Sequence, residues 1–154
     1  MVAKRETRKS AAAGAAWRLF MDVVFQHQGH FLTLAQKFGL NPGSLKLLIS
    51  LDPKQPAPMS SAASLMQCDA STVTWLVDRL EEKALVERKP SPNDRRVKTI
   101  ALTKKGIVTQ QQIDAMLYEP PPALDALTDE DLEGLAKALR KIRAAQTGAM
   151  PSAS

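Results

Sequence analysis

The strongest constraint on the fold lies in residues 59–84, where two short helical patterns are separated by only a few residues. The second pattern carries an apolar stripe formed by Val73, Leu76, Val77 and Leu80. These positions share one face of a helix, because each residue turns the chain by about 100°. The opposite face is formed by Ser71, Trp75, Asp78 and Glu82. The pattern therefore predicts a helix with one side on a core and the other side turned to solvent.

Capping residues mark the ends of these two helices. Ser60 is the predicted N-cap of the first helix, and Asp69 is the predicted N-cap of the second, which runs from Ala70 to about Lys83. Two helices joined by such a short connection form a helix-turn-helix unit. On the second helix of such a unit, Ser and Thr side chains can bond DNA base edges or phosphates.

Trp75 stands on the outward face of the second helix, where a bulky indole is costly unless something covers it. One interpretation is that the ring packs against a neighbouring loop of the same chain. The other interpretation is a contact with DNA or with a protein partner.

A β-hairpin is predicted after the helix-turn-helix unit, with strands at residues 85–89 and 97–102 and a basic loop between them. Prolines stiffen this loop, and an arginine at a stiff hairpin tip suits insertion into a narrow minor groove. Asp94 is placed to hold the loop, or to orient Arg96 through a bidentate pair. Taken alone the pattern fits a solvated hairpin, but next to a helix-turn-helix unit it favours a nucleic-acid contact.

Helices are also predicted before the central segment. Residues 1–10 are charged and lack an apolar period, so they are expected to be disordered. A long helix is expected over residues 12–38, and Asn41 with Pro42 begins a second helix as N-cap and first helical residue. Residues 52–58 contain three prolines and are expected to form a loop.

Two further helices are predicted after the hairpin. Thr103 caps the first, which extends to about Tyr118 and is broken by the prolines at residues 120–122. The Thr128-x-x-Asp131 pattern is a capping box that begins the last helix. This helix is expected to end near residue 144, and the tail from residue 146 is expected to fray.

Composition excludes several classes of protein. A chain of 154 residues with 44% hydrophobic and 24% charged residues fits one compact domain or two small lobes. A single cysteine excludes an internal disulfide framework and a Cys-rich zinc module. No run of 18 apolar residues is present, and the apolar stretch after the basic start is too short for an export signal. The expected location is therefore cytoplasmic, without a membrane partner.

Positive charge is concentrated outside the C-terminal third of a chain whose net charge is +5. Residues 60–106 carry nine basic and six acidic side chains, whereas residues 107–154 carry four and seven. This asymmetry indicates a surface that faces a polyanion. No catalytic triad, glycine-rich phosphate loop, paired-carboxylate or metal-ligand motif appears, so neither an enzyme nor a cofactor is expected.

Residues 65–106 resemble the winged helix-turn-helix core of the MarR family of bacterial regulators. The likeness is carried by Ser71-Thr72-Val73-Thr74, Leu76-Val77-Asp78-Arg79-Leu80-Glu81, Leu85-Val86-Glu87-Arg88, Asp94-Arg95-Arg96 and Leu102-Thr103. It extends more weakly to residues 39–42 and 127–132. The resemblance implies a mainly α fold with a small β-hairpin wing. A winged helix-turn-helix region at 41–103 would then join a helical dimerisation region at 11–40 and 104–145.

The resemblance also implies a sequence-specific DNA-binding transcriptional regulator, a homodimer on a pseudo-palindromic operator, and in many members a repressor released by a small aromatic or lipophilic effector. The DNA-contacting positions that it implies are Ala70, Ser71, Thr72, Thr74, Trp75, Arg95 and Arg96, and Ser60, Arg79 and Lys98 are predicted to join them. Asp94 would organise the wing. The candidate effector pocket consists of Trp17, Phe20, Met21, Phe25 and Phe31, which alternatively form the core of a dimer.

Several positions depart from the family pattern. Gln67 and Ala84 stand where glycines are common, and Trp75 stands where an arginine is often found. The segment at residues 118–122 shortens or bends the penultimate helix, so a differently shaped dimer base is expected. Trp75 in place of a cation also favours an alternative function, a winged-helix protein-interaction module without its own operator.

Three residues are candidates for sensing an oxidant or a metal. Cys68 would need a stabilised thiolate, and the neighbouring Asp69 opposes one, so a buried structural thiol is favoured. His27 and His30 are three residues apart on one predicted helix, a spacing that can hold a metal. A third ligand is not near them in the sequence, so no metal site is expected.

Overall fold

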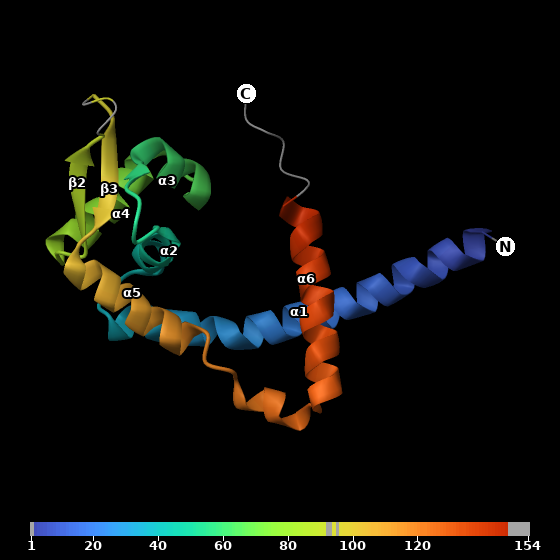
Figure 1. The fold of residues 1–154 in the computed structure, drawn as a ribbon. Coiled ribbons are helices and arrows are strands. Elements are labelled where there is room, and N and C mark those ends of the chain that lie inside the picture. Colours follow the sequence, from blue (N-terminus) through green and yellow to red (C-terminus); the bar gives the residue numbers. More distant parts are fainter. Residues whose placement is uncertain (1, 92–93, 95, 148–154) are drawn as a thin grey trace. The chain divides into compact units, whose positions relative to one another are not determined.

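The first of two units in the chain is built around the helix-turn-helix and a small sheet (Figure 1). The computed structural model describes residues 2–91, 94 and 96–147. The units are Met1–Tyr118 and Glu119–Ser154, and each is described by itself. The elements of the first unit are α1 (Val2–Lys37), α2 (Pro42–Ser50), β1 (Ala57–Pro58), α3 (Met59–Met66), α4 (Ala70–Glu82), β2 (Val86–Pro90), β3 (Lys98–Leu102) and α5 (Lys104–Leu117). The second unit contains the 3₁₀ helix η1 (Pro122–Ala126) and α6 (Asp129–Thr147).

The sheet has three antiparallel strands in the order β1-β3-β2. Strands β2 and β3 form the predicted hairpin, in which Val86 lies opposite Leu102. The predicted class, mainly α with a small β wing, is therefore confirmed. The prediction of a loop over residues 52–58 is wrong for its last two residues, which form β1 and pair with β3. Pro58 conceals this strand in the sequence, and it is tolerated there because β1 lies at the edge of the sheet.

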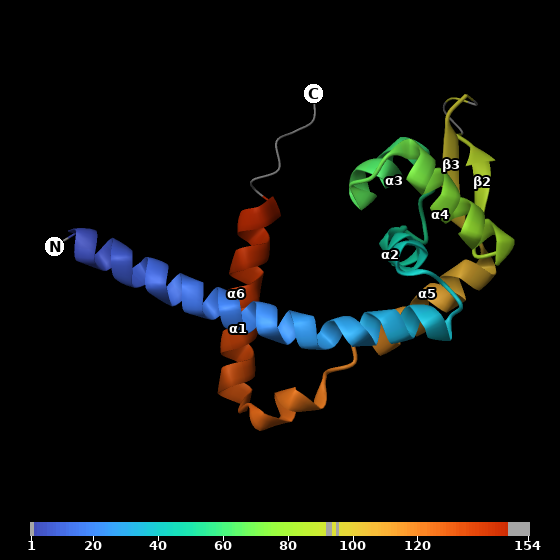
Figure 2. The same cartoon turned by 180° about the vertical axis from the view of Figure 1, so that it is seen from behind.

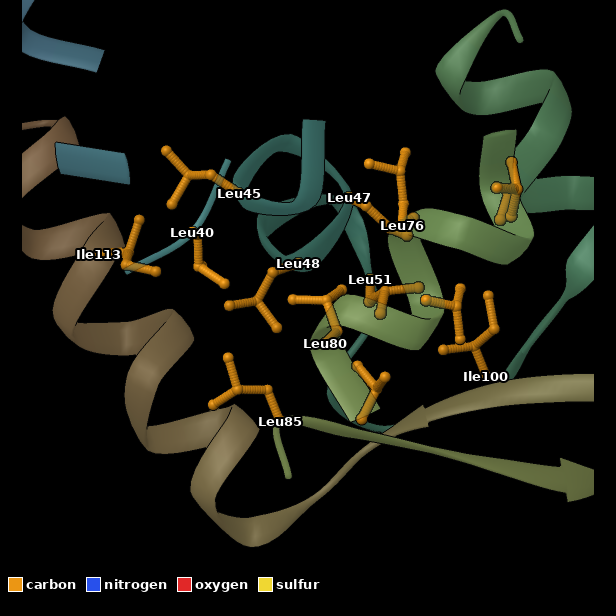
Figure 3. Close-up of a cluster of buried hydrophobic side chains, with 14 of the residues drawn as sticks. Leu40, Leu45, Leu47, Leu48, Leu51, Leu76, Leu80, Leu85, Ile100 and Ile113 are labelled. Carbon is orange, nitrogen blue, oxygen red and sulfur yellow. The ribbon is translucent and has the colours of Figure 1, made fainter. Parts of the chain in front are cut away.

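The core of the first unit is a cluster of aliphatic side chains contributed by α2, α4, α5 and the sheet (Figure 3). Helix α2 supplies Leu45, Leu47 and Leu48, none of which has exposed surface. The stripe predicted for α4 is confirmed, since its four members are at most 4% exposed. Burying one such side chain stabilises a fold by about 1.5–3 kcal/mol. This cluster therefore fixes which side of α4 faces outward.

The predicted caps of α2 and α5 are confirmed. The Asn41 side chain accepts a hydrogen bond from the Ser44 N–H at 2.8 Å, and Pro42 is the first residue of α2. The Thr103 hydroxyl oxygen accepts one from the Gly106 N–H at 2.9 Å. Each cap satisfies a backbone donor that the helix itself leaves free.

Helix α1 begins at Val2, whereas the sequence analysis predicted disorder over residues 1–10. The alanine-rich residues 11–16 are strong helix formers, and they extend the helix toward the N-terminus. At the other end of α1, Leu34 and Ala35 are buried against the core. The N-terminal half of α1 runs out beyond the helix-turn-helix lobe, as both views show (Figures 1 and 2).

The second unit is a proline-rich connection followed by α6. Helix α5 ends at Leu117 and η1 begins at Pro122, so the predicted break at the prolines is confirmed. The capping box is confirmed as well: the Thr128 hydroxyl donates to Asp131 Oδ2 at 2.7 Å, and the Asp131 N–H donates back to that hydroxyl at 3.3 Å. The bond from the Thr128 hydroxyl is the main reason why the pKa of Asp131 lies below its ordinary value. Helix α6 continues to Thr147, slightly beyond its expected end.

Candidate nucleic-acid interface

Helices α3 and α4 form the predicted helix-turn-helix unit, but the predicted cap at Ser60 is wrong. Helix α3 begins at Met59, and its N-cap, Pro58, makes no side-chain capping hydrogen bond. Because Pro58 is also paired with β3, the start of α3 is fixed by the sheet and not by a hydroxyl. Ser60 lies exposed in the first turn of α3, and its carbonyl accepts from the Ser64 hydroxyl at 3.2 Å. A DNA contact by Ser60 stays a prediction.

The turn between the two helices is set by Gln67 and Asp69. Gln67 ends α3 with a φ of 53°, a left-handed conformation that favours glycine. Asp69 is the N-cap of α4, as predicted, and its carboxylate accepts from the Thr72 N–H at 2.7 Å and from the Ser71 hydroxyl at 2.6 Å. These bonds, led by the one from Ser71, lower the pKa of Asp69 to about 2. Asp69 is therefore ionised at any physiological pH.

The outer face of α4 carries the predicted contact residues. Ala70, Ser71, Thr72, Thr74, Trp75 and Arg79 all have substantial solvent exposure. The hydroxyl of Thr74 donates to the Ala70 carbonyl at 2.8 Å. The structure thus brings the residues predicted on this helix to one accessible surface, and their contacts with DNA stay a prediction.

Trp75 is half-exposed, since 49% of its surface is open to solvent. The Arg79 guanidinium lies 5.9 Å from the centre of the indole ring, within the range of a cation–π interaction. Arg79 also pairs with Glu82 at 2.9 Å on the same helix. A neighbouring loop therefore does not enclose the ring, and a contact of Trp75 with DNA or with a protein partner stays a prediction.

Asp94 lies between β2 and β3 and accepts two backbone hydrogen bonds. Its carboxylate accepts from the Arg96 N–H at 2.9 Å, and its carbonyl accepts from the Val97 N–H at 3.0 Å. Asp94 thus fixes the backbone at Arg96 and Val97, within the described residues no bidentate pair with the Arg96 guanidinium accompanies these bonds, and its role as organiser of the wing stays a prediction. The side chains of Arg96 and Lys98 are exposed. Arg95 lies outside the described residues.

Arg88 joins strand β2 of the wing to helix α4, a role that the sequence prediction did not assign. Its guanidinium donates to Glu81, to Asp78 at 2.6 Å and to the Thr74 carbonyl at 3.2 Å. Its backbone N–H donates to Glu81 Oε1 at 2.9 Å. Two acids three residues apart on α4, followed by a basic residue in the next strand, are the sequence signal that could have indicated this role.

The three candidate sensing residues, Cys68, His27 and His30, contact the core or backbone carbonyl groups. Cys68 is half-buried and packs against the core. A ring nitrogen of His27 lies 3.1 Å from the Val23 carbonyl, and one of His30 lies 3.0 Å from the Met116 carbonyl. In the part of the chain that the structure describes, no group of three or more His, Cys, Asp or Glu side chains could hold a metal ion. Over the same residues, no helix is long and apolar enough to cross a bilayer.

The five residues of the candidate effector pocket do not share one environment. Trp17 and Phe20 stack with ring centres 5.6 Å apart, and Trp17 is 60% exposed. Phe25 is also exposed, Met21 is half-buried, and Phe31 packs against the core of the lobe. Within this one chain these side chains are therefore not enclosed, and their role as an effector pocket stays a prediction.

The helix-turn-helix unit with a β wing defines a winged helix-turn-helix protein, and sequence comparison identifies its family. The sequence profile of the MarR family matches residues 40–98. The HTH-type transcriptional regulator MhqR of Bacillus subtilis (strain 168) is 32% identical over 107 residues, which are 69% of this chain and 74% of the relative. The HTH-type transcriptional repressor MdtR of the same organism is 33% identical over 97 residues, which are 62% of this chain and 63% of the relative.

Solved structures agree with this fold. The YusO protein from Bacillus subtilis superimposes with a TM-score of 0.65 at 29% identity, over 87% of this chain and 96% of that one. A point mutant of MepR from S. aureus, bound to an oligodeoxyribonucleotide, has a TM-score of 0.62 at 21% identity, over 85% and 97% of the two chains. The chain belongs to the MarR family of DNA-binding transcriptional regulators, as its sequence motifs predicted. It is a regulator and not an enzyme.

Proposed function

We propose that the chain is a sequence-specific homodimeric repressor that binds a pseudo-palindromic operator in double-stranded DNA and is released by a small aromatic or lipophilic effector. The observation that carries the proposal is the exposed outer face of α4, with Ser71, Thr72 and Thr74, beside a wing that exposes Arg96 and Lys98. In a dimer, two such helices about 34–36 Å apart enter successive major grooves, while the wings reach the flanking minor grooves. Because the target is the chromosome, a cytoplasmic location belongs to the proposal.

The remaining proposed DNA contacts follow from position. Ser60 and Ala70 lie exposed near the N-termini of α3 and α4, where small side chains allow close approach to the DNA backbone. Arg79 and Trp75 lie further along α4. Arg95 is included because it adjoins Arg96 in the sequence. The relative MdtR is named a repressor, which supports the proposal that this chain represses transcription.

Exposed apolar side chains on the two terminal helices support a homodimer. On α1, Trp17, Leu19 and Phe25 are each more than half exposed, and on α6 Ile142 is 53% exposed. Apolar residues grouped along a helix in this way are typical of a surface that another chain covers. A second copy of the same chain would cover them symmetrically, through the regions 11–40 and 104–145.

The effector is proposed from the stacked pair Trp17 and Phe20, together with Met21 and Phe25 beside them on α1. Once a partner subunit covers this surface, its aromatic rings would offer an apolar cavity to a flat or lipophilic molecule. An effector of this kind would act by favouring a dimer in which the two copies of α4 have the wrong spacing for DNA.

Selection from a random pool of duplexes of about 30 bp, at near-physiological salt, tests the proposal. The expected result is enrichment of a pseudo-palindrome whose half-sites lie about one helical turn apart. Failure of a folded, dimeric sample to enrich any sequence would reject the operator. It would instead favour the alternative, a winged-helix protein-interaction module, which the exposed indole of Trp75 also fits.

Salt dependence separates these two functions. For a DNA-binding protein, the logarithm of affinity falls steeply with the logarithm of salt concentration, and Arg96→Ala should reduce that slope by about 1 for each phosphate that the arginine neutralises. An unchanged slope would remove Arg96 from the DNA-binding surface. A shallow slope in the parent protein would favour the interaction module, since an indole-centred interface releases few counterions.

A further inference from the structure

Two hydroxyl groups on the outer face of α4 already donate hydrogen bonds to acceptors at the start of the same helix. The Ser71 hydroxyl donates to the Asp69 carboxylate at 2.6 Å, and the Thr74 hydroxyl donates to the Ala70 carbonyl at 2.8 Å. What these groups still offer to DNA is acceptor oxygen. The acceptor atoms of guanine, adenine and thymine in the major groove therefore find few free donors here.

Trp75 is the large apolar group on the same face. Its side chain is 49% exposed, although the chain has a well-packed core in which apolar side chains of α4 are fully covered. Arg79, one turn further along, lies over the ring at 5.9 Å and is itself tied to Glu82 at 2.9 Å. The ring is thereby supported on one side while much of its surface remains open.

An apolar group in the major groove has one distinctive target. Among the base edges exposed there, only thymine presents a methyl group, and apolar side chains distinguish it by contact. We infer that Trp75 is a specificity-determining residue that reads the 5-methyl group of a thymine in each half-site, with Arg79 as the residue that positions the indole. This inference rests on the proposed function, since it requires that α4 enters the major groove.

Replacing thymine by deoxyuridine tests the inference, because it removes the methyl group and leaves every hydrogen-bonding atom in place. The probe is the duplex recovered by selection from the random pool, with its thymines replaced one at a time in both half-sites. Affinities are measured for the parent protein and for Trp75→Phe and Trp75→Ala, at a salt concentration low enough for all of them to bind. Leu65→Ala is the matched control, since Leu65 is a 52% exposed apolar residue of α3 in the same lobe.

At one thymine in each half-site, deoxyuridine should weaken binding by the parent protein about fourfold per half-site, the effect of one buried methyl group. Trp75→Phe should keep part of this discrimination, Trp75→Ala should lose it, and Leu65→Ala should retain it in full. Arg79→Gln should reduce the thymine-to-deoxyuridine ratio, a readout that overall stability would not change.

Two results would overturn the inference while leaving a DNA-binding regulator intact. One is a selected operator whose thymines can all be replaced without weaker binding. The other is an equal effect of deoxyuridine on the parent protein and on Trp75→Ala. Trp75 would then face a protein partner or only solvent. Absence of any enriched duplex is a different outcome, because it rejects the proposed function itself and the inference with it.

Discussion

The lobe around α4 and the segment of α1 from Trp17 to Phe25 place their apolar side chains in opposite ways. In the lobe, Leu45, Leu80 and Ile100 are at most 1% exposed. On α1, Trp17 and Phe25 are 60% and 57% exposed. The lobe therefore draws its stability from contacts within one chain, whereas the apolar surface of α1 becomes stabilising only when another molecule covers it.

Substitutions in the two regions should therefore affect different measurements. A change in the lobe should alter the free energy of unfolding. A change on the exposed surface of α1 should alter association, and it should alter apparent stability only through mass action. Single substitutions in each region test that separation.

Phe20→Ala is expected to have the largest effect, and to have it on the dimer. Burial of one aromatic side chain contributes about 1.5–3 kcal/mol, and a symmetric interface contains two copies. The dissociation constant should therefore rise roughly 10²- to 10⁴-fold, measured by analytical ultracentrifugation over a range of concentrations.

The control for Phe20→Ala is Leu65→Ala, because Leu65 is exposed to a similar degree but lies in α3. It should leave the dissociation constant unchanged, and circular dichroism should show both variants folded. If Phe20→Ala dimerises as tightly as the parent protein, the exposed surface around Phe20 is not the dimer interface.

Gly106→Ala should strongly destabilise the fold of the lobe. A Cβ atom on Gly106 would lie 1.8 Å from the Leu85 carbonyl oxygen, which is backbone and cannot rotate away. The free energy of unfolding should fall by about 3 kcal/mol or more, as in severe overpacking, when measured by urea at fixed protein concentration. Gly134→Ala on α6 is the control, since nothing lies within 4 Å of its added Cβ, and a helical alanine there should stabilise by up to about 1 kcal/mol. Similar results for the two variants would contradict the close contact at Leu85.

Arg88→Ala should have an intermediate effect, by loosening the wing from α4. The Arg88 side chain is 22% exposed and pairs with Asp78 and Glu81, whose side chains are 46% and 32% exposed, so solvent weakens the pairs. A decrease of about 1–2 kcal/mol in unfolding free energy is expected from charge-assisted hydrogen bonds in this setting. Arg79→Ala is the control, because its pair with Glu82 lies on one exposed helix face and should contribute about 0.3–0.5 kcal/mol. Equal decreases would show that Arg88 contributes no more than a surface pair.

The sequence predicted most of the lobe because its signals are local. The stripe of α4, the caps at Asn41, Asp69 and Thr103, and the hairpin each depend on residues close together in the chain. Strand β1 was missed because its evidence is a pairing with β3, which lies far along the chain, and its own sequence contains a proline. The start of α3 was misplaced for the same reason.

The candidate site was predicted less completely than the fold. The sequence put Ser71, Thr72 and Trp75 on or beside one outward face, and the structure places them there. It did not give the bonds that occupy their hydroxyls, nor the role of Arg88, since both depend on side-chain geometry across several turns. The pocket residues on α1 are exposed in the single chain, so their role depends on a surface that a second copy would supply.

The smallest predicted effect concerns strain that the lobe carries, at Ala84 in the turn between α4 and β2. Ala84 has a φ of 57°, a left-handed conformation that costs a residue with a Cβ atom about 1–2 kcal/mol and costs glycine nothing. Glycine loses more conformational freedom on folding, so Ala84→Gly should stabilise the protein by a net amount of about 0.5–1 kcal/mol in a urea titration. Ala115→Gly is the matched control, since Ala115 is exposed within α5, where glycine should cost about 1 kcal/mol. Opposite signs for the two substitutions would locate the strain at Ala84. A decrease of stability in both would mean that the turn is relaxed with alanine.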